Sequence, residues 1–341
     1  MSDFTELVDL AAERVGGAVL LANDDFFAPK ENLIKAARPV FLEHEYTERG
    51  KWMDGWESRR RRTPGHDWCI LKLGLPGRIR GVTVDTSFFR GNYPEACSID
   101  ALMADGDPEA ADLAAEGTQW SEILPRVRLQ GDSANGFPIE SGGRFTHLRL
   151  NIYPDGGVAR LRVHGDVLPD WDRLTRFGGL VDLAAVENGG VVLACNDMFF
   201  GSRHNLIMPG RSVNMGDGWE TKRSRRQGSD WVIVKLGARG TIRRVEVDTN
   251  HFKGNFPESC LLEACDAPGA SAAVLAEPGH AWVELLPRTK LRAHYRHFYD
   301  DIAPAAGAVT HVRLSIFPDG GVSRLRLHGQ VDPGSGLGGA G

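Results

Sequence analysis

The chain has 341 residues, of which 42% are hydrophobic and 25% charged, and its formal net charge is −5 at pH 7. Proteins that bind nucleic acids or anionic membranes usually carry an excess of basic residues, which this chain lacks. No stretch approaches the roughly 18 apolar residues of a membrane span, and no secretory signal is evident. The composition therefore favours a soluble, cytoplasmic protein with a small-molecule or protein partner, and disfavours nucleic acid and membrane.

The chain contains an internal duplication. The segment Asp54–Arg60, Asp-Gly-Trp-Glu-Ser-Arg-Arg, returns as Asp217–Arg223, Asp-Gly-Trp-Glu-Thr-Lys-Arg. Earlier landmarks lie 173 residues apart and later ones 163 apart, so the first copy carries ten extra residues between Asn32 and Asp54. A unit this long is a duplicated domain, because solenoid periods are roughly 20–50 residues. We expect domains at 1–169 and 170–333, then a flexible glycine-rich tail at 334–341.

The elements predicted in each copy are short. An apolar pattern at 7–12 predicts a short helix closed by Gly16-Gly17, since glycine adopts the left-handed conformation at little cost. Two β-type runs at 68–74 and 79–85 are separated by glycine and proline, which predicts a turn and antiparallel pairing.

The clearest pattern is a predicted hairpin near the end of each copy. In Thr146–Tyr153, alternation places Leu148 and Ile152 on a buried face. Pro154–Gly157 can turn the chain, because proline fixes one φ and glycine supplies a positive φ, and Arg160–Gly165 is then the return strand. Many short strands with turns between them predict an all-β fold of two tandem antiparallel β-sandwiches.

These segments resemble the allantoicase family. The resemblance is carried by Gly50–Arg60, by Asp85–Glu95 and by the twin Pro-Asp-Gly-Gly-Val turns, and it covers the chain to about residue 330, duplication included. Separately, the pattern Asp67-Trp68-x-x-x-Lys72-Leu73-Gly74 is similar to galactose-binding-like jelly rolls. The family resemblance implies two such jelly rolls in tandem. It also implies the hydrolysis of allantoate to ureidoglycolate and urea in purine (allantoin) catabolism.

The implied substrate carries one carboxylate and two ureido groups on one carbon. Its site needs a guanidinium for the anion and a carboxylic acid for proton transfer. Glu57 and its copy Glu220 are the candidate catalytic residues. The candidates for carboxylate binding are Arg59, Arg60 and Arg223, of which Arg59 is replaced by Lys222 in the second copy. The structural alternative is a surface loop in which Glu and Arg pair while the tryptophan packs in the core.

Further polar groups could bind the urea edges. The pairs Asn23-Asp24 and Asn196-Asp197 follow an apolar strand, although such pairs more often cap turns through their own backbone. The loop candidates are Asn92, Glu95, Asn255 and Glu258. The second copy has Lys253 for Arg90 and Phe256 for Tyr93, and it lacks the ten-residue insert, which could be a lid, a subunit contact or a solvated excursion. The first copy is therefore favoured for chemistry.

Three expectations concern partners and cofactors. Five cysteines without a Cys-x-x-Cys pair indicate reduced thiols, and no metal-binding or phosphate-binding motif is evident. We expect no cofactor, with a divalent metal left open if His and carboxylates converge from distant segments. A homo-oligomer is expected. The arginines of the predicted hairpin could bind the substrate carboxylate, but their repetition favours a solvated sheet face or a symmetric subunit contact. The rival class is a tandem jelly-roll module that binds carbohydrate or another ligand without catalysis.

Overall fold

The computed structural model describes residues 4–224, 228–300, 302 and 307–332. The chain divides into two compact units, Met1–Leu168 and Pro169–Gly341. The glycine-rich segment 334–341, for which the sequence predicts a flexible tail, lies outside the described residues.

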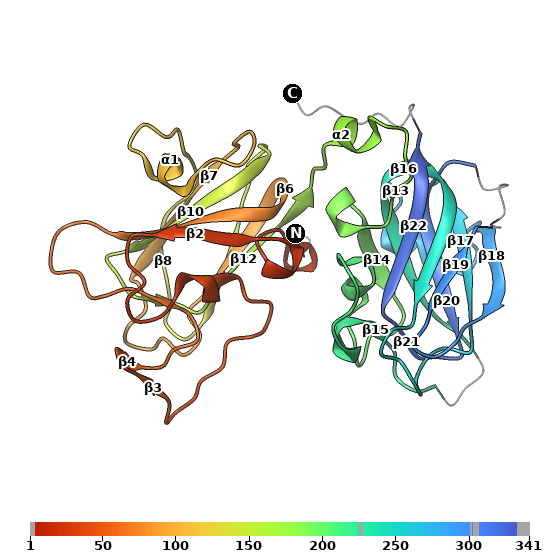
Figure 1. Cartoon of the computed structure of the whole chain (residues 1–341), viewed down its shortest axis with the longest axis horizontal. Helices are drawn as coiled ribbons and strands as arrows, with labels where there is room; N and C mark the ends of the chain where they lie inside the picture. The colour runs from red at the N-terminus through yellow and green to blue at the C-terminus, as the bar shows by residue number, and fades with distance from the viewer. Residues whose placement is uncertain (1–3, 225–227, 301, 303–306, 333–341) are drawn as a thin grey trace. The chain divides into compact units, whose positions relative to one another are not determined.

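The first unit is built almost entirely of strands, with a few short helical turns (Figure 1). In chain order its elements are η1 (Phe4–Glu6), β1 (Val8–Asp9), η2 (Glu13–Val15), β2 (Ala18–Ala22), η3 (Lys30–Ile34), β3 (Tyr46–Thr47), β4 (Gly50–Lys51), β5 (Trp56–Glu57), β6 (Asp67–Asp85), β7 (Ala96–Leu102), α1 (Ala110–Ala114), β8 (Ser121–Arg128), β9 (Ala134–Pro138), β10 (Phe145–Tyr153), β11 (Gly157–Val158) and β12 (Arg160–Val167).

The long strand β6 organises the first unit. Its first part, Asp67–Lys72, pairs with β10 and β2, and its last part, from Gly77, pairs with β12 and β9. All of these pairings are antiparallel. Because the two parts of β6 have different partner strands, β6 contributes to both layers of a sandwich. The core between them consists of side chains that alternate along the strands. Its fully buried members include Leu71, Val82, Val84, Leu148, Leu150, Leu161 and Val163.

The prediction of two paired strands at 68–74 and 79–85 is wrong, because both runs belong to the single strand β6. Residues 73–76 lie where β6 exchanges one set of partners for the other. There the N–H groups of Gly74 and Leu75 donate to the carbonyl of Leu10 at 2.9 and 3.3 Å. Pro76 has no N–H, and in this gap between ladders none is needed.

The predicted hairpin is also wrong in its pairing. The strands β10 and β12 form at the expected places, but β10 pairs with β6 and β7 while β12 pairs with β6 and β1. The turn at Pro154–Gly157 therefore joins different parts of the sandwich instead of closing a ladder. Leu148 and Ile152 are fully buried as predicted, but His147 on the other face is also buried, at 1% exposure.

The helix predicted at 7–12 does not form. Val8–Asp9 is the short strand β1, paired with β12, and the helical turn comes later, at Glu13–Val15. The carboxylate of Asp9 accepts hydrogen bonds from the backbone N–H of Val163 at 2.9 Å, which fixes an extended backbone that a six-residue helix could not outcompete. Gly16 has the predicted left-handed conformation, with φ of 95°.

The second unit repeats this architecture around the long strand β16. In chain order its elements are α2 (Trp171–Thr175), β13 (Val181–Asp182), η4 (Val186–Asn188), β14 (Val191–Cys195), η5 (Arg203–Ile207), η6 (Met215–Asp217), β15 (Trp219–Glu220), β16 (Asp230–Asp248), β17 (Ser259–Cys265), α3 (Ala272–Leu275), β18 (Val283–Lys290), β19 (Arg296–Tyr299), β20 (Val309–Phe317), β21 (Gly321–Val322) and β22 (Arg324–Val331). The strand order of its sheet matches that of the first unit. The predicted fold class, two tandem antiparallel β-sandwiches, is thus confirmed.

Two further features concern the helices and the cysteines. Among the described residues, none of the helices has the length and hydropathy needed to cross a membrane. The five cysteines are free thiols, and four of them are buried.

Candidate active site

Glu57 is positioned by two short strands of the first unit. β5 pairs with β11, which places Glu57 opposite Gly157 and Trp56 opposite Val158. Trp56 is fully buried and donates its indole N–H to the carbonyl of Asp24 at 2.8 Å. A Cβ at Gly157 would lie 1.9 Å from the ring of Phe89, so only glycine allows β11 to approach this closely. Alternation along β5 then directs Glu57 away from the buried tryptophan.

The carboxyl group of Glu57 lies in an environment that favours its protonated form. Burial raises its pKa, and a hydrogen bond from Asn92, whose amide nitrogen lies 2.7 Å from Oε1, offsets only part of that effect. The loop that carries Asn92 is itself held in place, because the backbone carbonyl of Asn92 accepts a hydrogen bond from Gly157 N–H at 2.7 Å. Glu57 is therefore a better proton donor at neutral pH than a solvated glutamate.

Glu57 and Asn92 line a cavity of about 350 Å³. Two cations, Lys51 and Arg90, lie on its wall, together with the aromatic rings of Phe41 and Phe88. Arg90 is held loosely, because its side chain is 80% exposed and makes one ion pair, with Asp132 at 3.1 Å. The cavity thus combines a carboxylic acid, an amide and two cationic groups.

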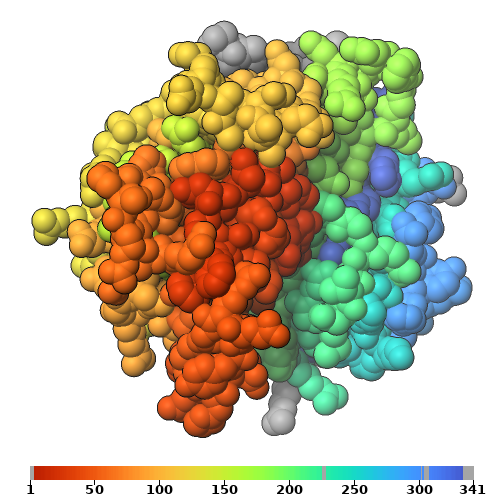
Figure 2. All heavy atoms as spheres, turned by 60° about the vertical axis from the view of Figure 1, so that its left-hand side comes forward, coloured from red at the N-terminus to blue at the C-terminus, as the bar shows by residue number. Residues whose placement is uncertain are grey.

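The ten-residue insert of the first copy forms one wall of this cavity. It contains the hairpin of β3 and β4, which projects at the edge of the first unit (Figures 1 and 2). Phe41 stacks on Phe88 with ring centroids 5.6 Å apart. Lys51 lies over the Phe41 ring at 4.9 Å and donates to the carbonyl of Glu43 at 2.6 Å. The second copy lacks these ten residues.

Arg59 and Arg60 line a different cavity, also of about 350 Å³, which shares no residue with the first. Arg59 forms an ion pair with Asp24 at 2.7 Å, whereas Arg60 is exposed. Although burial alone would raise the pKa of Asp24, hydrogen bonds from Arg59 and from Phe26 N–H hold it below its usual range. Glu57 and Arg60, the pair that the sequence suggested, are therefore not brought into one cavity.

The Asn-Asp pairs make equivalent hydrogen bonds to distant segments in both units. The Asn23 amide donates to Asp67 at 3.0 Å, and its oxygen accepts from Trp68 N–H at 2.8 Å. In the second unit, Asn196 donates to the carboxylate of Asp230, and Asp197 accepts from Lys222 N–H, both at 2.8 Å. The turn-capping role that the sequence favoured is seen in Asp24 and Asp197, whose carboxylates accept hydrogen bonds from the backbone N–H two residues on, of Phe26 at 3.1 Å and of Phe199 at 3.2 Å.

The remaining candidates are distributed unevenly. Glu220 on β15 receives a hydrogen bond from Asn255, which repeats the Glu57–Asn92 pair. Glu95 is exposed and is not part of the Glu57 cavity, and Glu258 forms a surface ion pair with Arg288 at 3.3 Å. Arg223 is exposed.

Sequence reasoning missed Lys51 as a candidate and used Arg90 only to compare the copies. A signal was present, because Arg90 is replaced in the second copy and Lys51 lies in the segment that contains the insert. Within the described part of the chain, no group of three or more His, Cys, Asp or Glu side chains is arranged to hold a metal ion.

Comparisons with known proteins agree on one family. The family model described as "Allantoicase repeat" matches the chain twice, over residues 8–168 and 181–332. A probable allantoicase of Pseudomonas aeruginosa is 50% identical over 327 residues, which cover 96% of this chain and 96% of that protein. An allantoicase of Dictyostelium discoideum is 49% identical over 95% of this chain and 87% of its own length. The crystal structure of allantoicase from Saccharomyces cerevisiae matches with a TM-score of 0.80 and 37% identity, covering 94% of this chain and 92% of that one.

Proposed function

The chain belongs to the allantoicase family, and on this premise we propose that it hydrolyses allantoate to ureidoglycolate and urea, a step of purine catabolism. The main structural support for this proposal is the Glu57 carboxyl group. Its pKa is raised by burial, and it lies in a cavity that Asn92, Lys51 and Arg90 also line. The test is the release of urea from allantoate by the purified full-length chain. The alternative of a non-catalytic binding module is not favoured by relatives of this similarity.

We propose that the cavity binds the substrate by its two kinds of polar group. Arg90 and Lys51 attract the carboxylate, and the guanidinium of Arg90 can hold both of its oxygens. The side-chain oxygen of Asn92 is available to accept a urea N–H, because its amide nitrogen donates to Glu57. Arg60 in the neighbouring cavity and Arg223 in the second unit remain alternatives for carboxylate binding.

The proposed reaction uses Glu57 twice. In its acid form Glu57 protonates the nitrogen of the departing ureido group, and the electron pair of the broken C–N bond leaves with urea. The nitrogen of the other ureido group shares its lone pair with the carbon, which becomes acylimine-like. Water then adds to that carbon and gives a proton to the Glu57 carboxylate, so that ureidoglycolate forms and the acid is restored. In this scheme, the second unit carries the corresponding but less complete pair Glu220–Asn255.

The pH dependence of the reaction should follow the protonation state of the Glu57 carboxyl group. Since the acid form is required and burial raises the pKa of Glu57, kcat/KM should fall as pH rises through that pKa. The measurement is the pH profile of urea release. An unchanged alkaline fall in the residual activity of Glu57→Gln would show that another group is responsible.

Arg90 should contribute mainly to substrate binding. Arg90→Gln should raise KM for allantoate about tenfold, since a guanidinium–carboxylate contact is lost, while kcat changes less. Steady-state kinetics check this, and the matched control is Lys253→Gln, the same position in the second copy. Equal effects of the two substitutions would contradict a binding role confined to the first unit.

The cellular setting and the assembly state belong to the same proposal. Five free cysteines support a reducing compartment such as the cytoplasm. A homo-oligomer stays a prediction, which the molar mass of the purified protein in solution would test.

A further inference from the structure

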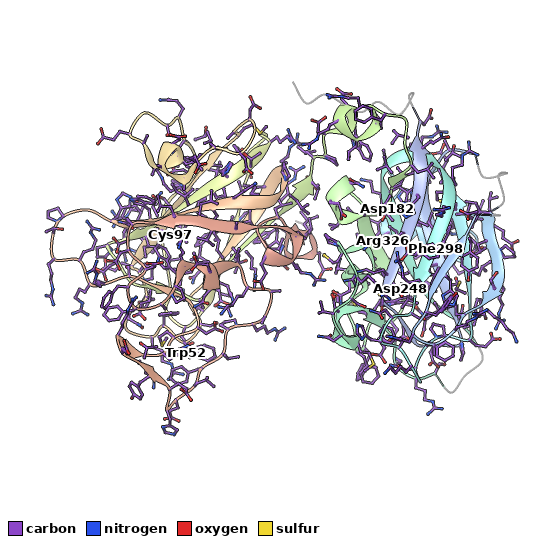
Figure 3. The ribbon with its side chains drawn as sticks, in the orientation of Figure 1. Trp52, Cys97, Asp182, Asp248, Phe298 and Arg326 are labelled. Carbon is purple, nitrogen blue, oxygen red and sulfur yellow. The ribbon has the colours of Figure 1, made fainter. Side chains whose placement is uncertain are left out.

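The second unit contains a charged cavity of about 490 Å³ that the proposed reaction does not use. Its floor is the face of the sheet formed by β16, β19 and β22, and Figure 3 shows four of its residues, Asp182, Asp248, Phe298 and Arg326, on one side of this unit. The side chains that line it include those of Arg211, Arg244, Glu246, Asp248, Arg296 and Phe298.

Three guanidinium groups are placed to meet a ligand. Arg296 binds Glu246 through two hydrogen bonds of 2.7 and 2.9 Å, Arg211 contacts Asp248 at 3.3 Å, and Arg244 contacts Asp300 at 2.6 Å. The side chains of Arg211, Arg244 and Arg296 are nevertheless 54%, 49% and 43% exposed. Their other N–H groups have no hydrogen-bonding partner among the described residues, so they are available to an anion.

The duplicated strands allow an exact comparison with the first unit. In the strand ladders, Asp248 of β16 lies opposite Arg324 of β22 and Arg296 of β19. At the equivalent place in the first unit, Asp85 of β6 lies opposite Arg160 of β12 and Ala134 of β9. The counterparts of Arg244, Glu246, Arg296 and Phe298 are therefore Gly81, Thr83, Ala134 and Gly136. Small, uncharged residues on one face of the first sheet correspond to charged and aromatic residues in the second.

The first unit fills the equivalent space with its own chain. A Cβ at Gly81 would lie 2.3 Å from the ring of Phe4, and that ring lies 6.0 Å from the ring of His164. The counterpart of Phe4 in the second copy is Phe177, whose side chain is 92% exposed. Arg244 occupies the position of Gly81, so the aromatic residue cannot pack there and the cavity is open.

We propose that this cavity binds a small carboxylate that also carries urea or amide groups. The guanidinium groups of Arg211, Arg244 and Arg296 suit the carboxylate. The Arg296 guanidinium lies over one face of the half-exposed Phe298 ring, 5.0 Å from its centroid, and the other face offers a flat surface for a planar urea. Glu187 on the cavity wall can accept the urea N–H groups. The choice of a ureido carboxylate rests on the proposed function, since both allantoate and ureidoglycolate carry these groups.

The test is calorimetric titration of the full-length chain with N-carbamoylglycine, which has one carboxylate and one ureido group. The double substitution Arg244→Gly with Arg296→Ala installs the residues of the first unit, and Arg211→Gln is a milder change at an exposed side chain. Each should weaken binding to the second unit about tenfold or more, the size expected when a charged contact is lost. Arg38→Gln, the counterpart of Arg211 in the first copy, is the matched control and should leave this binding unchanged.

The same titration with allantoate and with ureidoglycolate, on the Glu57→Gln background, shows whether substrate or product binds more tightly; either order supports the site. The proposal is overturned if the wild type gives no saturable binding. It is also overturned if binding is lost in Arg90→Gln but unaffected by the substitutions in the second unit. Absence of urea release from allantoate would overturn the proposed function instead, so the two failures can be told apart.

Discussion

Glu57→Gln should lower the rate of urea release from allantoate by about 10²- to 10⁴-fold, the usual contribution of a positioned general acid and base. The substitution keeps the size of the side chain, but an amide cannot deliver a proton to the departing ureido nitrogen. The expected loss is in kcat, since Arg90 and Lys51 still attract the substrate carboxylate. Initial rates of urea release from purified wild type and variant measure the effect.

The duplication provides the matched control. Glu220 occupies the same position in the second unit and receives the same hydrogen bond from an asparagine, but it has no insert wall beside it. Glu220→Gln should therefore leave most of the activity intact. Full activity in Glu57→Gln would remove this residue from the proton-transfer role, and loss confined to Glu220→Gln would move the chemistry to the second unit.

Asp54→Ala should lower the free energy of unfolding of the first unit by about 3–5 kcal/mol, because it leaves the charge of Arg160 buried without its partner. The side chains of Arg160 and Asp54 are only 1% and 7% exposed, and their closest atoms lie 2.7 Å apart. Arg160 also donates to the backbone carbonyls of Asp54 and Ala37, at 2.9 and 3.0 Å, which ties the segment before Glu57 to β12. Urea denaturation followed by tryptophan fluorescence measures the loss.

The pH dependence of this effect has a defined sign. Burial alone would raise the pKa of Asp54, but the hydrogen bonds from Arg160 and from Val40 N–H lower it. The stability from this carboxylate is therefore present above its unfolded pKa and is lost as pH falls through the lower folded value. The control is Asp166→Ala, which breaks an exposed pair with Arg80 and should cost at most about 1 kcal/mol. A cost for Asp54→Ala no greater than for the control would contradict this account.

The sequence predicted the class of fold because alternation and repeats are local patterns, but strand pairing depends on distant residues. The runs on either side of Pro76 looked like two strands because proline and glycine usually mark turns. They form one strand because the partners change at that point, from β10 and β2 to β12 and β9. The same limit explains the hairpin, whose two strands form as predicted but pair with β6 instead of each other.

The site was harder to predict than the fold, because its residues come from separate segments. Glu57 and Asn92, both named from the sequence, are brought within hydrogen-bonding distance. Arg60, only three residues from Glu57, lines another cavity, so closeness in sequence misled. Lys51 lines the cavity because the β3–β4 hairpin of the insert folds against the Glu57 site. Neither alternation nor residue spacing in the sequence could predict this fold of the insert.

The two units differ at the Glu57 cavity and at the charged cavity of the second unit. The first has gained a wall of the Glu57 cavity through its insert, and it has filled the space above Gly81 with Phe4. The second lacks the insert and has an open, charged cavity at the position that corresponds to Gly81. Duplication has thus preserved one sandwich twice while the side chains on equivalent faces have diverged, which we expect of units with different tasks.

The most direct test of the central claim is the crystal structure of the Glu57→Gln variant with allantoate. We expect allantoate in the first unit, with a ureido nitrogen about 3 Å from the side chain at position 57 and its carboxylate at Arg90 or Lys51. Occupancy of the inferred site in the second unit does not affect this result. Allantoate bound only elsewhere, with the Glu57 cavity empty, would contradict the account.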